Sequence, residues 1–257
     1  MLNVLIVMPF EDRHKDYIQA IGPDASYTYA TIPTVTLEQV KAADVIIGNA
    51  PANLVKENDH LQWIQLNSAG ADAYCKPGIL KEETLLTCAT GAYGLSVSEY
   101  MLTMSMMLCR KMDLYMRNQV KETWQPEGKV TSIWGSTVLI LGLGDIGGEY
   151  AKRCKALGAY TIGVRRKPGD KPEYLDEIHT IADLDELLPR ADFVSMVLPG
   201  TPETCHIIDE RRLALMKPTA YLINAGRGNA VDPDALYKAL ENGIIAGAAL
   251  DVTDPEP

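Results

Sequence analysis

An apolar run that ends in a glycine-rich turn constrains this chain more than any other feature. The run is Val138–Leu141, and the glycines that follow it, at positions 142, 144 and 147, have the spacing G-x-G-x-x-G. Residues 149–157 then have the composition of a helix. The order of strand, glycine turn and helix is typical of a βαβ unit that binds a dinucleotide. An ordinary tight turn is the alternative.

Each glycine of this turn has a physical role in such a unit. Gly142 permits the tight turn, Gly144 lets backbone approach a pyrophosphate, and Gly147 lets the helix pack closely against the strand. The pyrophosphate then lies on the N–H groups at the positive end of the helix. The residues we expect to bind the cofactor here are Gly142, Gly144, Asp145, Ile146 and Gly147.

Strands and helices alternate in two segments of the chain, which indicates parallel sheets. The strands expected in the first segment are 3–8, 26–30, 45–48, 63–66 and 85–88, and those in the second are 137–141, 160–164, 193–197, 220–224 and 246–251. The helices expected between them include 12–20, 37–42, 149–157, 182–188, 209–215 and 233–243. We therefore predict an α/β fold with two doubly wound parallel-sheet domains, residues 1–95 and 96–257.

A single long helix is expected over residues 97–123, between the two segments. Its first half is apolar nearly all round, from Tyr100 to Leu108. A helix of this kind is usually buried on most sides. It is expected to join the domains or to lie in a subunit interface.

The composition excludes several classes of function. The net charge of -10 disfavours a nucleic-acid-binding surface, which needs a basic face. The five cysteines are scattered, so we expect neither a disulfide framework nor a metal site. Cysteines of this kind are typical of a reducing compartment, so we expect the protein in the cytoplasm. No signal peptide is recognised, and no apolar stretch is long enough to span a membrane.

The end of the second strand in the nucleotide-binding segment bears on the choice of cofactor. In NAD-binding folds this strand normally ends in an acid that binds the ribose 2′-hydroxyl. Here the strand ends in Arg165, Arg166 and Lys167. Guanidinium groups would bind a 2′-phosphate, whereas an acid would repel it. NADP(H) is therefore favoured and NAD(H) remains possible; a solvated basic loop is the other interpretation.

Four further segments contain motifs that indicate a protein family. They are Asn67–Asp72, Leu198–Thr204, Ile223–Asp232 and Ala249–Val252 with Glu256-Pro257. Together with the glycine turn they resemble the D-isomer-specific 2-hydroxyacid dehydrogenases, in particular the glyoxylate/hydroxypyruvate reductases and the phosphoglycerate-dehydrogenase-like members. The resemblance implies a flavodoxin-like substrate domain, a Rossmann domain and a long helix joining them. It also implies a homodimer that transfers a hydride between NAD(P)H and a small 2-oxo or 2-hydroxy acid.

The resemblance also assigns roles to individual residues. Arg227 matches the arginine that binds the substrate carboxylate, and Glu256 matches the acidic partner of the catalytic histidine. The loop of Ser68, Ala69 and Gly70 matches the backbone that binds the substrate carboxylate. The remaining matches contact the cofactor: Leu198, Pro199 and Thr204 at its ribose, and Ala225 and Asp251 at its nicotinamide.

The histidine that donates a proton in the family has no match here. In the family it lies in a Pro-His motif some tens of residues after the glutamate, and the histidines at 14, 60, 179 and 206 lack that context. We expect a C-terminally truncated chain whose first domain lacks its return segment and whose second lacks its last strand. Such a chain would have impaired activity. The alternative is a non-catalytic NAD(P)-sensing or partner-binding protein, which the missing histidine favours and the intact Arg227 and Glu256 disfavour.

Overall fold

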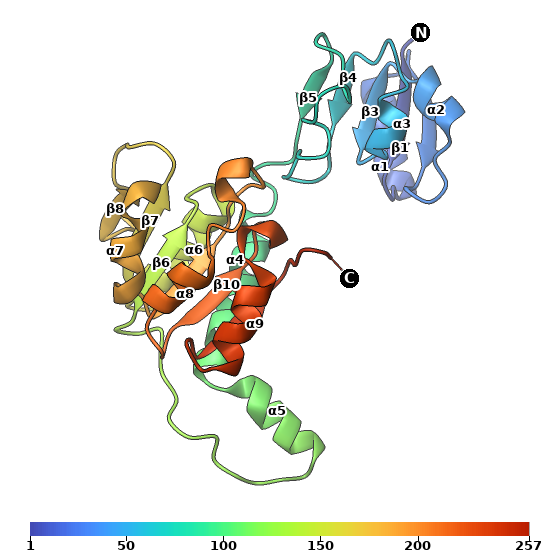
Figure 1. Cartoon of the computed structure of the whole chain (residues 1–257). Helices are drawn as coiled ribbons and strands as arrows, with labels where there is room; N and C mark the ends of the chain where they lie inside the picture. Colours follow the sequence, from blue (N-terminus) through green and yellow to red (C-terminus); the bar gives the residue numbers. More distant parts are fainter. Residues whose placement is uncertain (257) are drawn as a thin grey trace. The chain divides into compact units, whose positions relative to one another are not determined.

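The computed structural model describes residues 1–256, and the chain divides into two compact units (Figure 1). Unit 1 is Met1–Ala92, and unit 2 begins at Tyr93, just before the predicted division at residue 95. Both units are α/β structures with parallel sheets, which confirms the predicted fold class. None of the described helices combines the length and the apolarity needed to cross a bilayer.

Unit 1 contains a five-stranded sheet in the order β2-β1-β3-β4-β5, with every neighbouring pair parallel. This is the flavodoxin-like order 2-1-3-4-5. Its strands are β1 Asn3–Val7, β2 Ser26–Ala30, β3 Val45–Gly48, β4 Trp63–Gln65 and β5 Leu85–Thr87. Its helices are α1 Asp12–Ile21, α2 Leu37–Ala42 and α3 Ala52–Val55, the last of which was not predicted.

The side chains of β1 explain why this sheet is covered on both faces. Leu5 and Val7 belong to one buried cluster, whereas Val4 and Ile6 belong to another. Because successive side chains of a strand point to opposite faces, a run of four aliphatic residues needs apolar partners on both sides.

Unit 2 contains a six-stranded parallel sheet in the order β11-β10-β9-β6-β7-β8. Numbered within the unit, this is the Rossmann order 3-2-1-4-5-6. Its strands are β6 Thr137–Leu141, β7 Tyr160–Arg165, β8 Glu177–Thr180, β9 Phe193–Met196, β10 Tyr221–Asn224 and β11 Gly247–Leu250. The sequence analysis missed β8, because Ile178 is its one aliphatic residue and a half-buried edge strand needs no continuous apolar run.

Helices cover both faces of this second sheet. They are α4 Gly94–Cys109, α6 Asp145–Ala156, α7 Leu184–Leu187, α8 Glu210–Leu215 and α9 Pro233–Glu241, whereas α5 Met112–Val120 buries none of its residues. Val138 and Ile140 of β6 pack in one cluster with α4 and α6. Leu139 and Leu141 pack in another with α7, α8 and α9. Asp232 caps α9 and Pro233 opens it, as the sequence indicates.

The single long helix predicted over residues 97–123 is wrong. Lys111 adopts a left-handed conformation, with φ of 56°, and separates α4 from α5. The buried residues of α4 form one stripe that ends at Cys109, whereas α5 buries none of its residues. The apolar contacts that would continue the helix therefore end at Cys109. Other faces of α4 are partly exposed, so it is not buried on most sides as expected.

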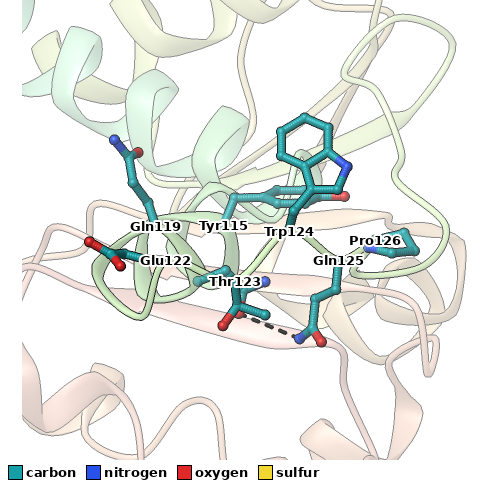
Figure 2. A pocket seen from close by; sticks show the side chains of 8 residues that line it. Tyr115, Gln119, Glu122, Thr123, Trp124, Gln125 and Pro126 are labelled. Carbon is teal, nitrogen blue, oxygen red and sulfur yellow. Dashed lines mark hydrogen bonds between the residues drawn. The ribbon is translucent and has the colours of Figure 1, made fainter.

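The segment after this break is held by its own polar contacts. We call residues 112–130, α5 and the loop after it, the arm. The backbone N–H of Glu127 donates to the Tyr115 hydroxyl at 3.2 Å, and Gln125 donates to the Glu127 carboxylate at 2.9 Å. A cavity of about 870 Å³ is lined only by residues of the arm (Figure 2). Trp124 on this cavity is fully exposed, at 102%.

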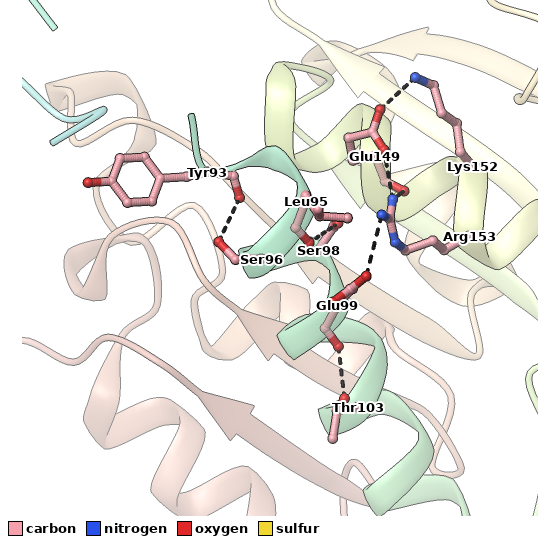
Figure 3. Close-up of polar contacts among 9 residues, drawn as sticks. All are labelled: Tyr93, Leu95, Ser96, Ser98, Glu99, Thr103, Glu149, Lys152 and Arg153. Carbon is pink, nitrogen blue, oxygen red and sulfur yellow. Dashed lines mark hydrogen bonds and ion pairs between the residues drawn. The ribbon is translucent and has the colours of Figure 1, made fainter. Parts of the chain in front are cut away.

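The packing of α4 on α6 combines an apolar interior, an ion-paired rim and one buried polar chain. At the rim, Arg153 of α6 pairs with Glu149 at 2.7 Å and lies 3.9 Å from Glu99 of α4 (Figure 3). Inside, the Ser195 hydroxyl donates to Tyr150 at 3.1 Å, and Tyr150 lies 2.8 Å from the Ser105 hydroxyl. These three groups link β9, α6 and α4.

Removing the Tyr150 hydroxyl is expected to destabilise unit 2. Tyr150 is fully buried, so Tyr150→Phe leaves the hydroxyls of Ser105 and Ser195 short of a partner where water cannot replace it. The expected loss in free energy of unfolding is about 1–3 kcal/mol. Urea unfolding followed by circular dichroism measures it. The control is Tyr237→Phe, at a tyrosine that is 65% exposed. Equal stability of the two variants would contradict the structural role.

Candidate functional site

The cofactor-binding candidates of unit 2 all follow strands at the carboxyl edge of its sheet. The glycine turn follows β6, Arg165 ends β7, the loop beginning at Leu198 follows β9, Ala225 follows β10, and Asp251 follows β11. Doubly wound sheets bind their ligands at this edge. The topology therefore gathers residues that are far apart in the sequence.

The three glycines of the turn have two different environments. Gly142 has φ of 99°, and a Cβ added to it would lie 2.5 Å from the Val197 carbonyl oxygen. A Cβ on Gly147 would lie 1.9 Å from the Gly142 carbonyl oxygen. A Cβ on Gly144 would meet no protein atom within 4 Å, although φ at this position is ordinary. The fold requires the first and last glycines, whereas the space beside Gly144 is open for a ligand.

The first turn of α6 adjoins this open space. The helix begins at Asp145 with Gly144 as its N-cap, four residues before the predicted start at 149. Within residues 1–256 no side chain caps this end. The N–H groups of a first helical turn lack intrahelical partners and attract anions. The turn and the helix therefore fit the pyrophosphate of a dinucleotide.

The Asp145 side chain lies against another helix. Its Oδ1 atom would be 2.2 Å from a Cβ added to Gly94 in the first turn of α4. A carboxylate at a helix N-terminus is electrostatically favourable. Asp145 thus joins the N-terminal ends of α4 and α6, a contact that spacing in the sequence could not reveal.

Arg165 and Arg166 do not have equivalent surroundings. The Arg165 Nε donates to the Lys167 carbonyl at 2.7 Å, and its terminal nitrogen donates to the Pro168 carbonyl at 3.3 Å. Arg165 also lines a cavity of about 180 Å³ with His179 and Asp183. Arg166 is exposed.

The turn that carries Arg227 is held by a buried side chain. Asn224, only 1% exposed, donates to the Arg227 carbonyl at 2.9 Å and accepts from the Gly226 N–H at 3.1 Å. The Arg227 guanidinium donates to the Gly226 carbonyl at 2.8 Å. The sequence analysis gave Asn224 no role, although a polar residue that ends an apolar strand is a usable signal.

Two further segments adjoin this turn. A Cβ on Gly226 would lie 2.6 Å from the Leu198 nitrogen, so the loop after β9 touches it. That loop is braced by Thr204, whose hydroxyl accepts from the Thr201 N–H at 2.9 Å and donates to the Pro199 carbonyl at 2.6 Å.

The segment after β11 also contacts the Arg227 turn. A Cβ on Gly228 would lie 2.0 Å from the Thr253 carbonyl oxygen, and Glu256 is exposed farther along this segment. The Asp251 N–H donates to the Asn224 carbonyl at 2.9 Å. Burial, with the hydrogen-bonded Asp251 carboxylate adding to it, raises the pKa of Tyr100 on α4. The sequence analysis did not identify this contact of Tyr100.

The carboxylate-binding candidate of unit 1 follows β4, at the carboxyl edge of its own sheet. The Ser68 hydroxyl donates to the Gly70 carbonyl at 2.7 Å, and the Ala89 N–H donates to the Ser68 carbonyl at 2.9 Å. Ser68, Ala69 and Gly70 are half-buried. The loop is therefore an ordered turn whose serine hydroxyl is used internally.

Each of the four histidines takes part in local structure. The His14 ring accepts from the Glu11 N–H at 3.2 Å, and the His60 ring lies 3.9 Å from Asp44. The His179 ring lies 2.7 Å from Glu177. The backbone N–H of His206 donates to the Asn229 carbonyl at 2.8 Å, close in sequence to Arg227.

Comparison with known proteins identifies the family. Residues 102–257 match the family model described as D-isomer specific 2-hydroxyacid dehydrogenase, NAD binding domain. The chain belongs to this family. The match confirms the resemblance derived from the motifs and assigns unit 2 to the NAD-binding part.

Relatives and solved structures agree with this assignment. The chain is 32% identical over 267 residues to a D-3-phosphoglycerate dehydrogenase of Methanocaldococcus jannaschii, covering 100% of this chain and 50% of the relative. A dehydrogenase of the same family from Aeromonas salmonicida superposes with a TM-score of 0.87 at 29% identity, covering 100% of this chain and 83% of the other. For a D-lactate dehydrogenase of Aquifex aeolicus, solved with NAD and lactic acid, the TM-score is 0.81 at 28% identity, with 98% and 77% covered. The chain thus spans half the length of the M. jannaschii relative.

Alanine substitutions at the two kinds of glycine are expected to separate folding from cofactor binding. Gly144→Ala places a methyl group in open space, so the melting temperature should not change, while affinity for pyridine nucleotides should fall about tenfold or more. Gly147→Ala drives a methyl group into the Gly142 carbonyl and should cost about 1–3 kcal/mol of stability. Thermal unfolding and quenching of tryptophan fluorescence by NADPH and NADH measure the two effects. Wild-type affinity in a folded Gly144→Ala variant would refute the assignment of the open space to the cofactor.

Proposed function

We propose that this chain acts as an oxidoreductase that transfers a hydride between a nicotinamide cofactor and a small 2-oxo or 2-hydroxy acid of the D-isomer series. One observation carries the proposal. The glycine turn with the open space at Gly144 and the hydrogen-bonded turn of Arg227 lie at the same edge of one sheet. Both turns contact the loop after β9. The family match and the relative solved with NAD and lactic acid support it.

The cofactor, when bound, supplies or accepts the hydride. The turn Gly142–Gly147 and the first turn of α6 would hold its pyrophosphate. Leu198, Pro199 and Thr204 are assigned to its ribose, and Ala225 and Asp251 to its nicotinamide. The hydrogen bonds that order these loops support the assignments, because a loop that is already ordered loses less conformational entropy when a ligand binds.

Arg227 is the proposed substrate-binding residue. A guanidinium can hold the carboxylate of a 2-oxo acid through two hydrogen bonds and polarise the adjacent carbonyl. The hydrogen bonds of the Asn224 side chain support this role because they fix the backbone of the turn that carries Arg227. The backbone N–H groups of the ordered loop Ser68–Gly70 are proposed to donate to the substrate carboxylate. Glu256 is proposed to orient an imidazole that donates the proton.

NADP(H) is the favoured cofactor, with NAD(H) as the alternative. The basic residues 165–167, at the end of β7, support the choice, since an acid normally stands there in NAD-binding folds. The five cysteines are unpaired, which supports a reducing compartment such as the cytoplasm.

Substitution of Arg227 tests the substrate assignment independently of turnover. Arg227→Ala should weaken binding of the 2-oxoacid analogue oxamate to the cofactor-loaded protein by about ten- to a hundredfold. Arg227→Lys should recover part of the loss, because lysine keeps the charge but not the paired geometry. Isothermal titration measures both, with the exposed surface residue Arg13→Ala as control. Unchanged oxamate binding by Arg227→Ala, with cofactor bound normally, would contradict the assignment of Arg227 to the substrate carboxylate.

A homodimer is also proposed, with the arm in its interface. The arm's helix buries none of its residues, and Val120 and Trp124 are 86% and 102% exposed. Apolar surface gathered on an ordered element is typical of an interaction site. Tyr100 and Met106 add exposed apolar surface on the neighbouring helix α4.

Trp124→Ala is expected to weaken the dimer at least about tenfold, since aromatic residues dominate interface energies. Sedimentation velocity at micromolar concentrations measures the change. Trp134→Ala is the matched control, because Trp134 is also exposed, at 77%, but lies outside the arm. A wild-type protein that sediments as a monomer throughout this range would contradict the proposal.

A further inference from the structure

The loop Ser68–Gly70 of unit 1 has backbone donors that the fold does not use. In the described part of the chain, the backbone N–H groups of Ser68, Ala69 and Gly70 donate to no protein acceptor. The three residues are nonetheless half-buried, and the Ser68 hydroxyl closes the turn on the Gly70 carbonyl at 2.7 Å. Successive backbone N–H groups of this kind can bind an anion. Their value for a carboxylate depends on a backbone that is fixed before the ligand binds.

Asn49 fixes the start of this loop. It follows β3, and its Oδ1 atom accepts from the backbone N–H of Asn67 at 3.2 Å. Because β3 and β4 pair, this bond joins the loops after two neighbouring strands. Gly48, just before Asn49, has φ of 109°, and a Cβ there would lie 2.3 Å from the Val7 carbonyl oxygen. The close approach at Gly48 therefore fixes the backbone that carries Asn49.

Tyr74 fixes the other end of the loop. Its hydroxyl donates to the Ala50 carbonyl at 2.5 Å, where Tyr74 is 7% exposed and Ala50 fully buried. Burial raises the pKa of Tyr74 to about 12, so its hydroxyl keeps its proton at neutral pH. Ala50 adjoins Asn49, so the loop after β3 holds the loop after β4 at two points. A third bond, from the Ala89 N–H to the Ser68 carbonyl at 2.9 Å, comes from the segment after β5.

Both contacts act directly on the residues that have unused donors. Asn67 immediately precedes Ser68. On the other side, the Tyr74 N–H donates to the Ala71 carbonyl at 2.9 Å, and Ala71 immediately follows Gly70. A short closed turn thus connects Tyr74 to the end of the loop. The three residues are held at both ends by one neighbouring loop.

We propose that Asn49 and Tyr74 are positioning residues for the substrate carboxylate, because they hold Ser68, Ala69 and Gly70 where their backbone N–H groups can donate to it. The inference rests on the proposed function, since it takes a carboxylate as the ligand of this loop. Neither side chain is assigned a contact with the substrate; both act through the backbone. The sequence indicated neither residue, because their partners lie 18 and 24 positions away.

The first variant tested is Asn49→Ala, which removes the acceptor for the Asn67 N–H. Its control is Asn53→Ala, at an exposed asparagine of α3 with no printed role in the loop. Asn49→Asp is the conservative variant, because it keeps an oxygen acceptor for Asn67. It should restore the order of the loop that Asn49→Ala loses.

The second variant is Tyr74→Phe, which removes the donor to Ala50 and keeps the ring. Tyr27→Phe is the matched control within unit 1. The Tyr27 hydroxyl also donates to backbone carbonyls, those of Ile18 and Gly22 at the end of α1, at 3.1 and 3.0 Å. Tyr27 is the second residue of β2 and so lies near the amino edge of the sheet, whereas the loop lies at the carboxyl edge. This control separates a general loss of stability from a loss of positioning.

Two measurements report on the loop. Hydrogen exchange followed by mass spectrometry on peptides covering residues 66–74 reports its order, and isothermal titration of the cofactor-loaded protein with oxamate reports its function. Asn49→Ala and Tyr74→Phe should each exchange these amides at least about threefold faster and bind oxamate about three- to tenfold more weakly. Affinity for NADPH should not change, because the proposed cofactor site belongs to unit 2. The two controls should change neither exchange in this segment nor oxamate binding.

Two results overturn the inference while the proposed function stands. One is wild-type exchange of residues 66–74 in both Asn49→Ala and Tyr74→Phe. The other is wild-type oxamate affinity in variants whose loop exchanges faster. Failure of the cofactor-loaded wild-type chain to bind oxamate would instead count against the proposed function, and the exchange rates would still decide whether the two residues hold the loop. Circular dichroism of each variant establishes that it is folded.

Discussion

Close backbone approach at the carboxyl edge of unit 2's sheet is the constraint on which the site depends. The turn after β6 touches the loop after β9 at Gly142, and the loop after β9 touches the turn after β10 at Gly226. At each contact a Cβ would collide with main-chain atoms. Three loops from three neighbouring strands are therefore fixed against one another without intervening side chains. Gly144 differs, because a Cβ added to it would meet nothing within 4 Å. The ordered loops around this open space define the place where a ligand can lie.

The electrostatics of this edge differ from those of the whole chain. The net charge is -10, which repels anions at long range. The edge nevertheless gathers the uncapped start of α6, the basic residues 165–167 and Arg227. One acid, Asp145, lies among them, against the start of α4. The positive groups gathered at this edge make it suitable for an anionic ligand in spite of the net charge.

The sequence predicted those features that depend on local patterns. The apolar run before Gly142 identified β6 and the turn, and the Asp232-Pro233 pair identified the start of α9. The parallel, doubly wound architecture of both units followed from the alternation of strands and helices together with the family resemblance. Arg227 was identified as a candidate through the family resemblance, because its motif is a short continuous stretch. These assignments need only residues that are adjacent in the chain.

Features that depend on contacts distant in sequence were missed. The break at Lys111 arises because burial ends at Cys109, while the residues that follow remain good helix formers. The strand β8 is half-buried at an edge and has little apolar character. The sequence pattern also could not distinguish Arg165, which is hydrogen-bonded to its own loop, from Arg166, whose side chain is exposed.

The central claim is that the edge around Gly144 binds a pyridine nucleotide. Titration calorimetry of the wild-type chain with NADPH and NADH, combined with thermal unfolding in saturating cofactor, tests it most directly. The account predicts a saturable heat with one site per chain and a raised melting temperature. The absence of both heat and a rise in melting temperature with either cofactor would contradict it.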